Sequence, residues 1–96
     1  MTEGNVLYYL DEGVKIILNV GVDISDSTVH KIKFKRPNRT SGYWDAKRES
    51  STSISYVIQE NDLNYVGIWK LQAYVETPSW KLHGKEASLQ VLGIQI

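Results

Sequence analysis

The side chains that could support catalysis or metal binding are few and widely separated. The two histidines, His30 and His83, each lie in a segment that alternates like a β-strand, and His30 falls on its apolar side. Short acidic pairs occur near residues 11–12, 23–26 and 60–62, but their spacing matches no calcium-binding loop, and solvated turn residues explain them better. No glycine-rich phosphate loop, metal-binding histidine pair or nucleophile elbow is present. The sequence therefore predicts no enzyme, no cofactor and no metal site.

A stripe of three lysines, Lys31, Lys33 and Lys35, follows one side of an alternating segment, with two arginines just beyond it. Such a stripe could contact a phosphate backbone or an acidic partner. The alternative is a solvated sheet face whose charges are matched by acidic neighbours such as Glu76 on an adjacent strand. This alternative is favoured because eleven basic and eleven acidic residues cancel, and no aromatic platform for RNA is interleaved with the stripe. No nucleic-acid partner is expected.

The aromatic residues are the second group of candidates. Three tryptophans are many for one small core. Trp69 is expected at the centre of that core, which leaves Trp44 and Trp80, both near turns, as candidate exposed anchors. Together with Tyr43 and Tyr74 they could dock a protein or stack against a sugar. The alternative is that both tryptophans cap the ends of the core.

The C-terminus is unusually apolar, since chain ends are generally polar and frayed. Ile94 and Ile96 could extend the last strand, or they could pair with a neighbouring subunit by strand addition. Both interpretations remain open. The complete candidate docking surface predicted from the sequence is Trp44, Trp80, Tyr74, Lys31, Lys33, Lys35, Ile94 and Ile96.

The elements that must position these side chains are strands. Apolar and polar residues alternate with period two in several segments, as at 67–76, and almost nothing repeats with the period of a helix. About seven short strands in a chain of this length predict an all-β, immunoglobulin-like antiparallel sandwich. The expected strands cover residues 5–10, 13–20, 28–36, 42–47, 53–59, 67–76 and 80–92.

Residues 1–96 are expected to form a single domain, because the chain has no linker and no room for a second core. The last expected strand changes parity, which predicts a β-bulge near Gly84 and Lys85. The absence of cysteine excludes a disulfide and any thiolate site, and favours a reducing compartment. The start of the sequence does not resemble a signal peptide, and no apolar run approaches the ~20 residues that span a bilayer. No membrane partner is expected.

Residues 62–71 carry a family resemblance. An acidic residue, Gly67, an aromatic residue at Trp69 and a core residue at Leu71 follow one another in this order. The order resembles the strand entry of immunoglobulin-like domains, in which the last two residues are tyrosine and cysteine. Here Leu71 removes the disulfide, and Trp69 replaces the tyrosine of the tyrosine corner.

Segments 14–40 and 67–76 are also similar to small phage virion proteins, including the immunoglobulin-like N-terminal domain of phage baseplate upper proteins. This resemblance covers roughly residues 14–91. It implies a non-enzymatic structural protein of the capsid or tail, in a decoration, fibre-base, baseplate or connector role. Such a protein would assemble in the host cytoplasm, reside in the virion, and dock to other virion proteins, including copies of itself. The alternative is a carbohydrate- or cell-surface-binding sandwich that uses Trp44 or Trp80 as its stacking platform.

Overall fold

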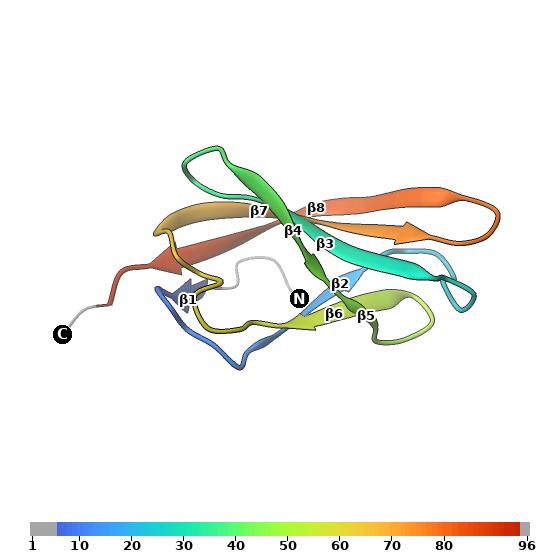
Figure 1. Ribbon diagram of the computed structural model, residues 1–96, viewed down its shortest axis with the longest axis horizontal. Coiled ribbons are helices and arrows are strands. Elements are labelled where there is room, and N and C mark those ends of the chain that lie inside the picture. Colours follow the sequence, from blue (N-terminus) through green and yellow to red (C-terminus); the bar gives the residue numbers. More distant parts are fainter. Residues whose placement is uncertain (1–5, 95–96) are drawn as a thin grey trace.

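The computed structural model describes residues 6–94, and within this range the chain forms only strands and loops, so it contains no helix that could cross a membrane. Eight strands form two sheets (Figure 1). One sheet has five strands in the order β1-β8-β7-β3-β4, and the other has three in the order β2-β6-β5. The strands are β1 (Val6–Tyr8), β2 (Lys15–Asn19), β3 (Val29–Lys35), β4 (Ser41–Asp45), β5 (Lys47–Arg48), β6 (Ser53–Val57), β7 (Gly67–Glu76) and β8 (Lys81–Leu92).

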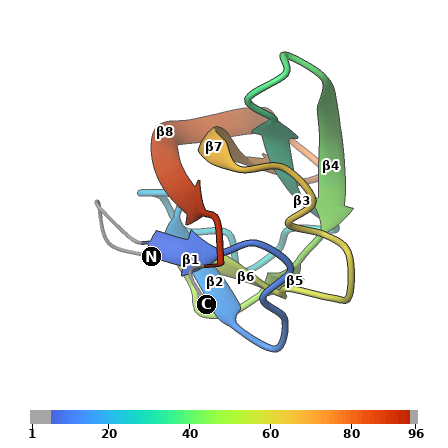
Figure 2. The same ribbon diagram turned by 90° about the vertical axis from the view of Figure 1, so that its left-hand side faces the viewer.

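The pairing is antiparallel except at one edge, where β1 runs parallel to β8. The chain changes sheet four times, between β1 and β2, β2 and β3, β4 and β5, and β6 and β7. Seen from the end, the five-stranded sheet curls over the three-stranded one (Figure 2). The fold is therefore the predicted immunoglobulin-like all-β sandwich, and without cysteine it has no disulfide.

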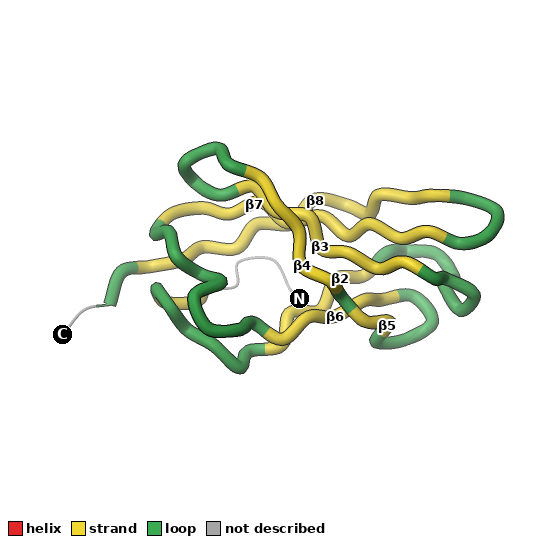
Figure 3. Tube along the Cα trace, viewed as in Figure 1, coloured by secondary structure: helices red, strands yellow, loops and turns green. Residues whose placement is uncertain are grey.

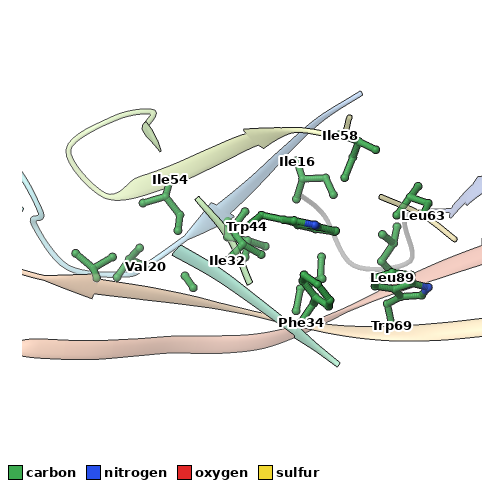
Figure 4. Close-up of a cluster of buried hydrophobic side chains, with 14 of the residues drawn as sticks. Ile16, Val20, Ile32, Phe34, Trp44, Ile54, Ile58, Leu63, Trp69 and Leu89 are labelled. Atoms are coloured by element: carbon green, nitrogen blue, oxygen red, sulfur yellow. The ribbon is translucent and has the colours of Figure 1, made fainter. Parts of the chain in front are cut away.

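The core lies between the two sheets, where inward-facing residues of both meet (Figure 4). Trp69, predicted to be central, is completely buried. Its ring centroid lies 5.4 Å from that of Phe34 and 6.1 Å from that of Trp44. Trp44 in turn stacks on Tyr56 of the opposite sheet, with centroids 5.0 Å apart and ring planes at 7°. An aromatic column thus joins the two layers, because these rings offer a large apolar area to the space between the sheets.

Trp69 also supplies the hydrogen bond that a tyrosine corner makes. Its indole Nε1–H donates to the backbone carbonyl of Tyr65, four residues earlier, at 3.0 Å. In a tyrosine corner the phenol bonds back to the backbone in the same way. The substitution of tryptophan for tyrosine therefore keeps this tie between β7 and the loop before it.

Gly67 at the start of β7 is required by its surroundings. Its φ of +136° is a conformation that residues with a Cβ rarely adopt. A Cβ at this position would also lie 2.8 Å from the ring of Pro37 in the β3–β4 turn. The glycine of the strand-entry pattern thus lets β7 begin directly against that turn.

All seven expected strands are present, β7 with the expected limits and the other six with ends shifted by a few residues, and β5 is an additional strand. β5 has only two residues, both exposed. The predicted bulge is confirmed. Gln72 pairs with Glu86 and Tyr74 pairs with His83, so that Gly84 and Lys85 together oppose one residue of β7. Beyond the bulge, β7 and β8 continue as a long hairpin that projects from one end of the molecule (Figure 3).

Candidate binding surface

Four lysines lie on the outer side of the five-stranded sheet, and we call them the lysine face: Lys31, Lys33 and Lys35 of β3 and Lys70 of β7. The neighbouring residues of both strands are buried, so alternation places these four on the opposite, solvent side. Across the β3–β7 ladder, Lys35 stands directly opposite Lys70. The sequence identified the first three lysines, whereas Lys70 joins them only through the strand register.

Two of these ammonium groups lie over aromatic rings. Lys31 Nζ is 4.2 Å from the ring centroid of Tyr43 on β4, and Lys33 Nζ is 4.4 Å from that of Tyr74 on β7. Lys33 Nζ is also 3.0 Å from Nε2 of His83 on β8, whose ring lies 4.9 Å from that of Tyr74. Because an ammonium group is only a donor, the His83 nitrogen facing it is the acceptor. The cations are thus held by rings, over which they sit favourably.

Asp45 stands directly opposite Lys31 in the β3–β4 ladder, whereas Lys33, Lys35 and Lys70 have no acidic residue directly opposite them. In the described part of the chain, only Lys70 of the four lies within 4.0 Å of a carboxylate, and its distance from Glu86 is 3.9 Å. The expectation that Glu76 matches the lysine charges is wrong. Glu76 stands opposite Val29 and Lys81, and its carboxylate accepts a hydrogen bond from the Tyr74 hydroxyl at 2.6 Å, which raises the pKa of Tyr74.

A shallow groove of about 280 Å³ runs across the lysine face. Its polar walls come from four strands, β3, β4, β7 and β8, and include the facing pair Lys35 and Lys70. Like charges placed directly opposite across a sheet repel, so this pair is destabilising without an anion. The polar side chains that line the groove are Lys33, Lys35, Ser41, Lys70, Gln72 and Glu86.

Arg36, which follows the stripe in sequence, is not part of this surface. Its guanidinium carbon lies 4.8 Å from the ring centroid of Phe34 and 5.7 Å from that of Trp69, and Nη1 donates to Thr40 Oγ1 at 3.2 Å. The side chain therefore covers one end of the aromatic column. Its charge is directed to the core residues rather than to the sheet face.

The prediction that Trp44 is an exposed anchor is wrong. Only 6% of the residue is exposed, because β4 pairs with β3 in a register that places Trp44 opposite the fully buried Ile32. Tyr43, the neighbouring residue, faces outward instead and is 54% exposed. Since strand residues alternate between faces, only one of two adjacent aromatics can enter the core.

The remaining predicted residues are scattered rather than gathered into one surface. Trp80 follows the β7–β8 turn, is 36% exposed, and lines an apolar groove of about 310 Å³ with Val22 and Leu82. Tyr74 is half-buried and belongs with the lysine face. Ile94 is 56% exposed at the opposite end from the hairpin, and Ile96 lies outside the described residues. The structure thus brings Tyr74 and the three stripe lysines together, but not Trp44, Trp80 or Ile94.

Another groove, of about 440 Å³, lies on the three-stranded side. Two of the charged side chains that line it, Lys15 and Glu49, pair with each other. Glu49 accepts hydrogen bonds from Ser55 Oγ at 2.8 Å and from Lys15 Nζ at 3.3 Å, and both lower the pKa of Glu49. The Glu49 carboxylate in this groove is therefore already bound by side chains of the protein itself.

One pair resembles catalytic chemistry. Ser27 Oγ lies 2.5 Å from His30 Nε2. Burial, followed by the nearby charge of Arg48, lowers the pKa of His30. A serine–histidine dyad also needs a group that orients the imidazole, and among the hydrogen bonds of residues 6–94 none joins His30 to a carboxylate. No group of three or more His, Asp or Glu side chains in these residues could hold a metal ion.

Comparisons with known proteins bear on the fold. No family model and no curated protein matches the sequence. Among solved structures, the chain is similar to the crystal structure of CopC from Methylosinus trichosporium OB3b. The TM-score is 0.64 at 11% sequence identity, and the match covers 99% of this chain and 89% of that one. At this identity the likeness establishes a shared sandwich fold and no more.

These findings correct the family prediction. The structural likeness reported above is to CopC rather than to a phage baseplate protein, and neither the family models nor the curated proteins support a phage origin. The predicted roles as a virion structural protein and capsid or tail component are therefore wrong, as is the virion localisation. The alternative of a carbohydrate-binding module that uses Trp44 or Trp80 is not supported either: Trp44 is buried, and no comparison points to such a module.

Proposed function

We propose that the protein is a non-catalytic binding module and that its lysine face docks an acidic polypeptide. The observation that supports this most directly is the imbalance of charge on that face. Four ammonium groups share one side of a sheet, and the closest carboxylate recorded for them is 3.9 Å from Lys70. Among the residues directly opposite these lysines, Asp45, opposite Lys31, is the one acid, and in residues 6–94 no carboxylate lies within 4.0 Å of Lys31, Lys33 or Lys35. Here the missing negative charge would come from the partner.

An acidic polypeptide fits this face better than a nucleic acid or a sugar. Both of the latter are commonly held by stacking on open aromatic faces. The rings of Tyr43 and Tyr74 already carry Lys31 and Lys33 at 4.2 and 4.4 Å. A local cluster of lysines is suited to a local cluster of carboxylates.

The test is a binding titration with a fluorescent oligoglutamate peptide. The protein should bind the peptide, and a double variant with Lys33→Gln and Lys35→Gln should weaken binding by about tenfold or more, since two charge-assisted contacts are lost. Raising NaCl to about 0.5 M should weaken it as well, because exposed charges are screened.

The matched control removes two lysines elsewhere, with Lys47→Gln and Lys85→Gln, and should bind like the wild type. A single-stranded DNA of equal charge is the competing probe. An equal loss of affinity for the peptide in both double variants would mean that only the overall charge of the protein matters, and the proposal would fail. Tighter binding of DNA than of oligoglutamate would replace the acidic polypeptide with a nucleic acid.

A further inference from the structure

The lysine face occupies only part of the outer side of the five-stranded sheet. Toward the end of the sheet where β1 joins it, the same side becomes apolar. Val6 and Tyr8 of β1 are 44% and 46% exposed, and Ile68 of β7 is 47% exposed. These three residues form what we call the apolar step. Exposed apolar side chains are ordinary when single, but a group of them on one face marks a contact surface.

The strand register fixes the position of the apolar step relative to the lysines. Ile68 precedes Lys70 by two residues on β7, so both point to the same side, about 7 Å apart. In the next two strands, Ile68 pairs with Gln90 and Gln90 pairs with Val6. On β7 the surface therefore changes from cationic at Lys70 to apolar at Ile68 within two residues. The row of residues that crosses the sheet from Ile68 through Gln90 to Val6 contains no acidic residue.

We infer that the acidic partner carries an apolar side chain next to its carboxylates, about two residues along an extended segment. The carboxylate would lie in the groove between Lys35 and Lys70, where it relieves the repulsion of these facing ammonium groups. The apolar side chain would then cover Ile68, which lies two residues from Lys70 on β7. This inference rests on the proposed function, since it specifies the sequence of the partner that the lysine face binds.

Charge and apolarity play different parts in this recognition. A carboxylate alone would be attracted to any of the four lysines and would select no register. An apolar side chain can be buried only at the step, so it fixes where along the sheet the partner lies. Removing even a modest apolar area from water favours binding by a factor of about ten. The step therefore supplies specificity that the lysines cannot.

The experiment compares two synthetic peptides of equal length and charge. Both have glutamates at alternate positions, so that these face one side of an extended chain. In the first peptide, leucines occupy the next alternate positions, so that they face the same side as the glutamates. In the second peptide, serines replace these leucines. Wild-type protein should bind the leucine peptide about tenfold more tightly than the serine peptide. Ile68→Ser should bring this ratio close to one.

The matched control is Val57→Ser, which removes a valine that is 40% exposed on the three-stranded side and should leave the ratio unchanged. Amide chemical shifts of each variant establish that it is folded. If the serine peptide binds through the lysine face and the leucine peptide binds no more tightly, the inference is wrong while the proposed function stands. If neither peptide responds to the loss of Lys33 and Lys35, the proposed function itself fails.

Discussion

At the scale of single residues, Trp69 links the strand-entry sequence to the core. It is fully buried, packs against Phe34 and Trp44, and ties its indole nitrogen to the Tyr65 carbonyl. Both parts of the side chain are used, since the ring fills volume in the core and the N–H donates to the Tyr65 carbonyl. Phenylalanine can replace neither the full ring volume nor the donor.

We therefore expect Trp69→Phe to lower the free energy of unfolding by about 2–4 kcal/mol, as the sum of a cavity and a lost hydrogen bond. Urea denaturation followed by far-UV circular dichroism measures this difference. Trp80→Phe is the control, because Trp80 is 36% exposed, and its cost should stay within about 0.5 kcal/mol. Similar losses in both variants would contradict the central place of Trp69.

His30 predicts how stability changes with pH. Burial, and then the charge of Arg48, lower the pKa of His30 in the folded protein, whereas an unfolded histidine titrates near its ordinary value of about 6.5. The unfolded chain therefore binds more protons just below that pH, and stability decreases as the pH falls from about 6.5 toward the folded pKa. Above about 6.5 the contribution is fully present.

Urea midpoints measured between about pH 7 and pH 5 should decrease for the wild type, and His30→Gln should flatten the slope. The lowered pKa values of Asp23 and Glu49 act in a separate range, below about pH 4, where carboxylates titrate. An unchanged slope in His30→Gln would assign the pH dependence to other groups.

Adjacent aromatics show what the sequence cannot decide at this scale. Tyr43 and Trp44 lie next to each other in a strand that has one aromatic residue for each face. Alternation alone does not say which of the two is buried. The register with β3 decides it, because Trp44 pairs with Ile32 and Tyr43 pairs with Lys33. Partner strands determine the inward face, and the sequence of one strand does not contain that information.

At the scale of elements, prediction succeeded where alternation was long. β7 has ten residues with four buried at every second position, and its limits were predicted without error. The bulge was predictable because β8 changes parity across it. β5 has two exposed residues and therefore no pattern to detect. Lys70 was missed as a site residue because its proximity to Lys35 comes from pairing between strands that are distant in sequence.

The facing pair Lys35 and Lys70 leads to a prediction for the β3–β7 ladder. Replacing one lysine of a directly opposed pair with an acid converts repulsion into attraction. Lys35→Glu should therefore raise the free energy of unfolding by about 0.2–1 kcal/mol, with less gain in about 0.5 M NaCl. The same variant should lose affinity for oligoglutamate, because it places a carboxylate where the peptide's would lie.

The double variant Lys35→Glu, Lys70→Glu restores two like charges and completes a double-mutant cycle. Its stability should return to about that of the wild type. A gain that persists in the double variant would mean that the two side chains do not interact, and that the groove holds no electrostatic strain for a ligand to relieve.

At the scale of the whole molecule, the basic and acidic residues cancel while one sheet face stays cationic. The molecule measures 48 × 24 × 22 Å, and its long hairpin and its apolar step lie toward opposite ends. The likeness to CopC extends over 99% of this chain at 11% identity, so nearly the whole sandwich is shared while the sequence is not. Function must therefore follow from the surface that this chain places on the common fold.

The single-domain prediction can be tested by the cooperativity of unfolding. One hydrophobic cluster draws residues from both sheets, and Trp44 stacks on Tyr56 across the layers. Tryptophan fluorescence therefore reports on packing between the sheets, whereas circular dichroism reports on the strands themselves. We expect the two signals to give one coincident urea transition, because both sheets contribute to one buried cluster. A fluorescence change at distinctly lower urea would show that the sheets separate before the strands unfold. In that case the five-stranded sheet could change its curvature, and the lysine face would change shape with it. Peptide affinity would then depend on that motion as well as on the contacts of a fixed surface.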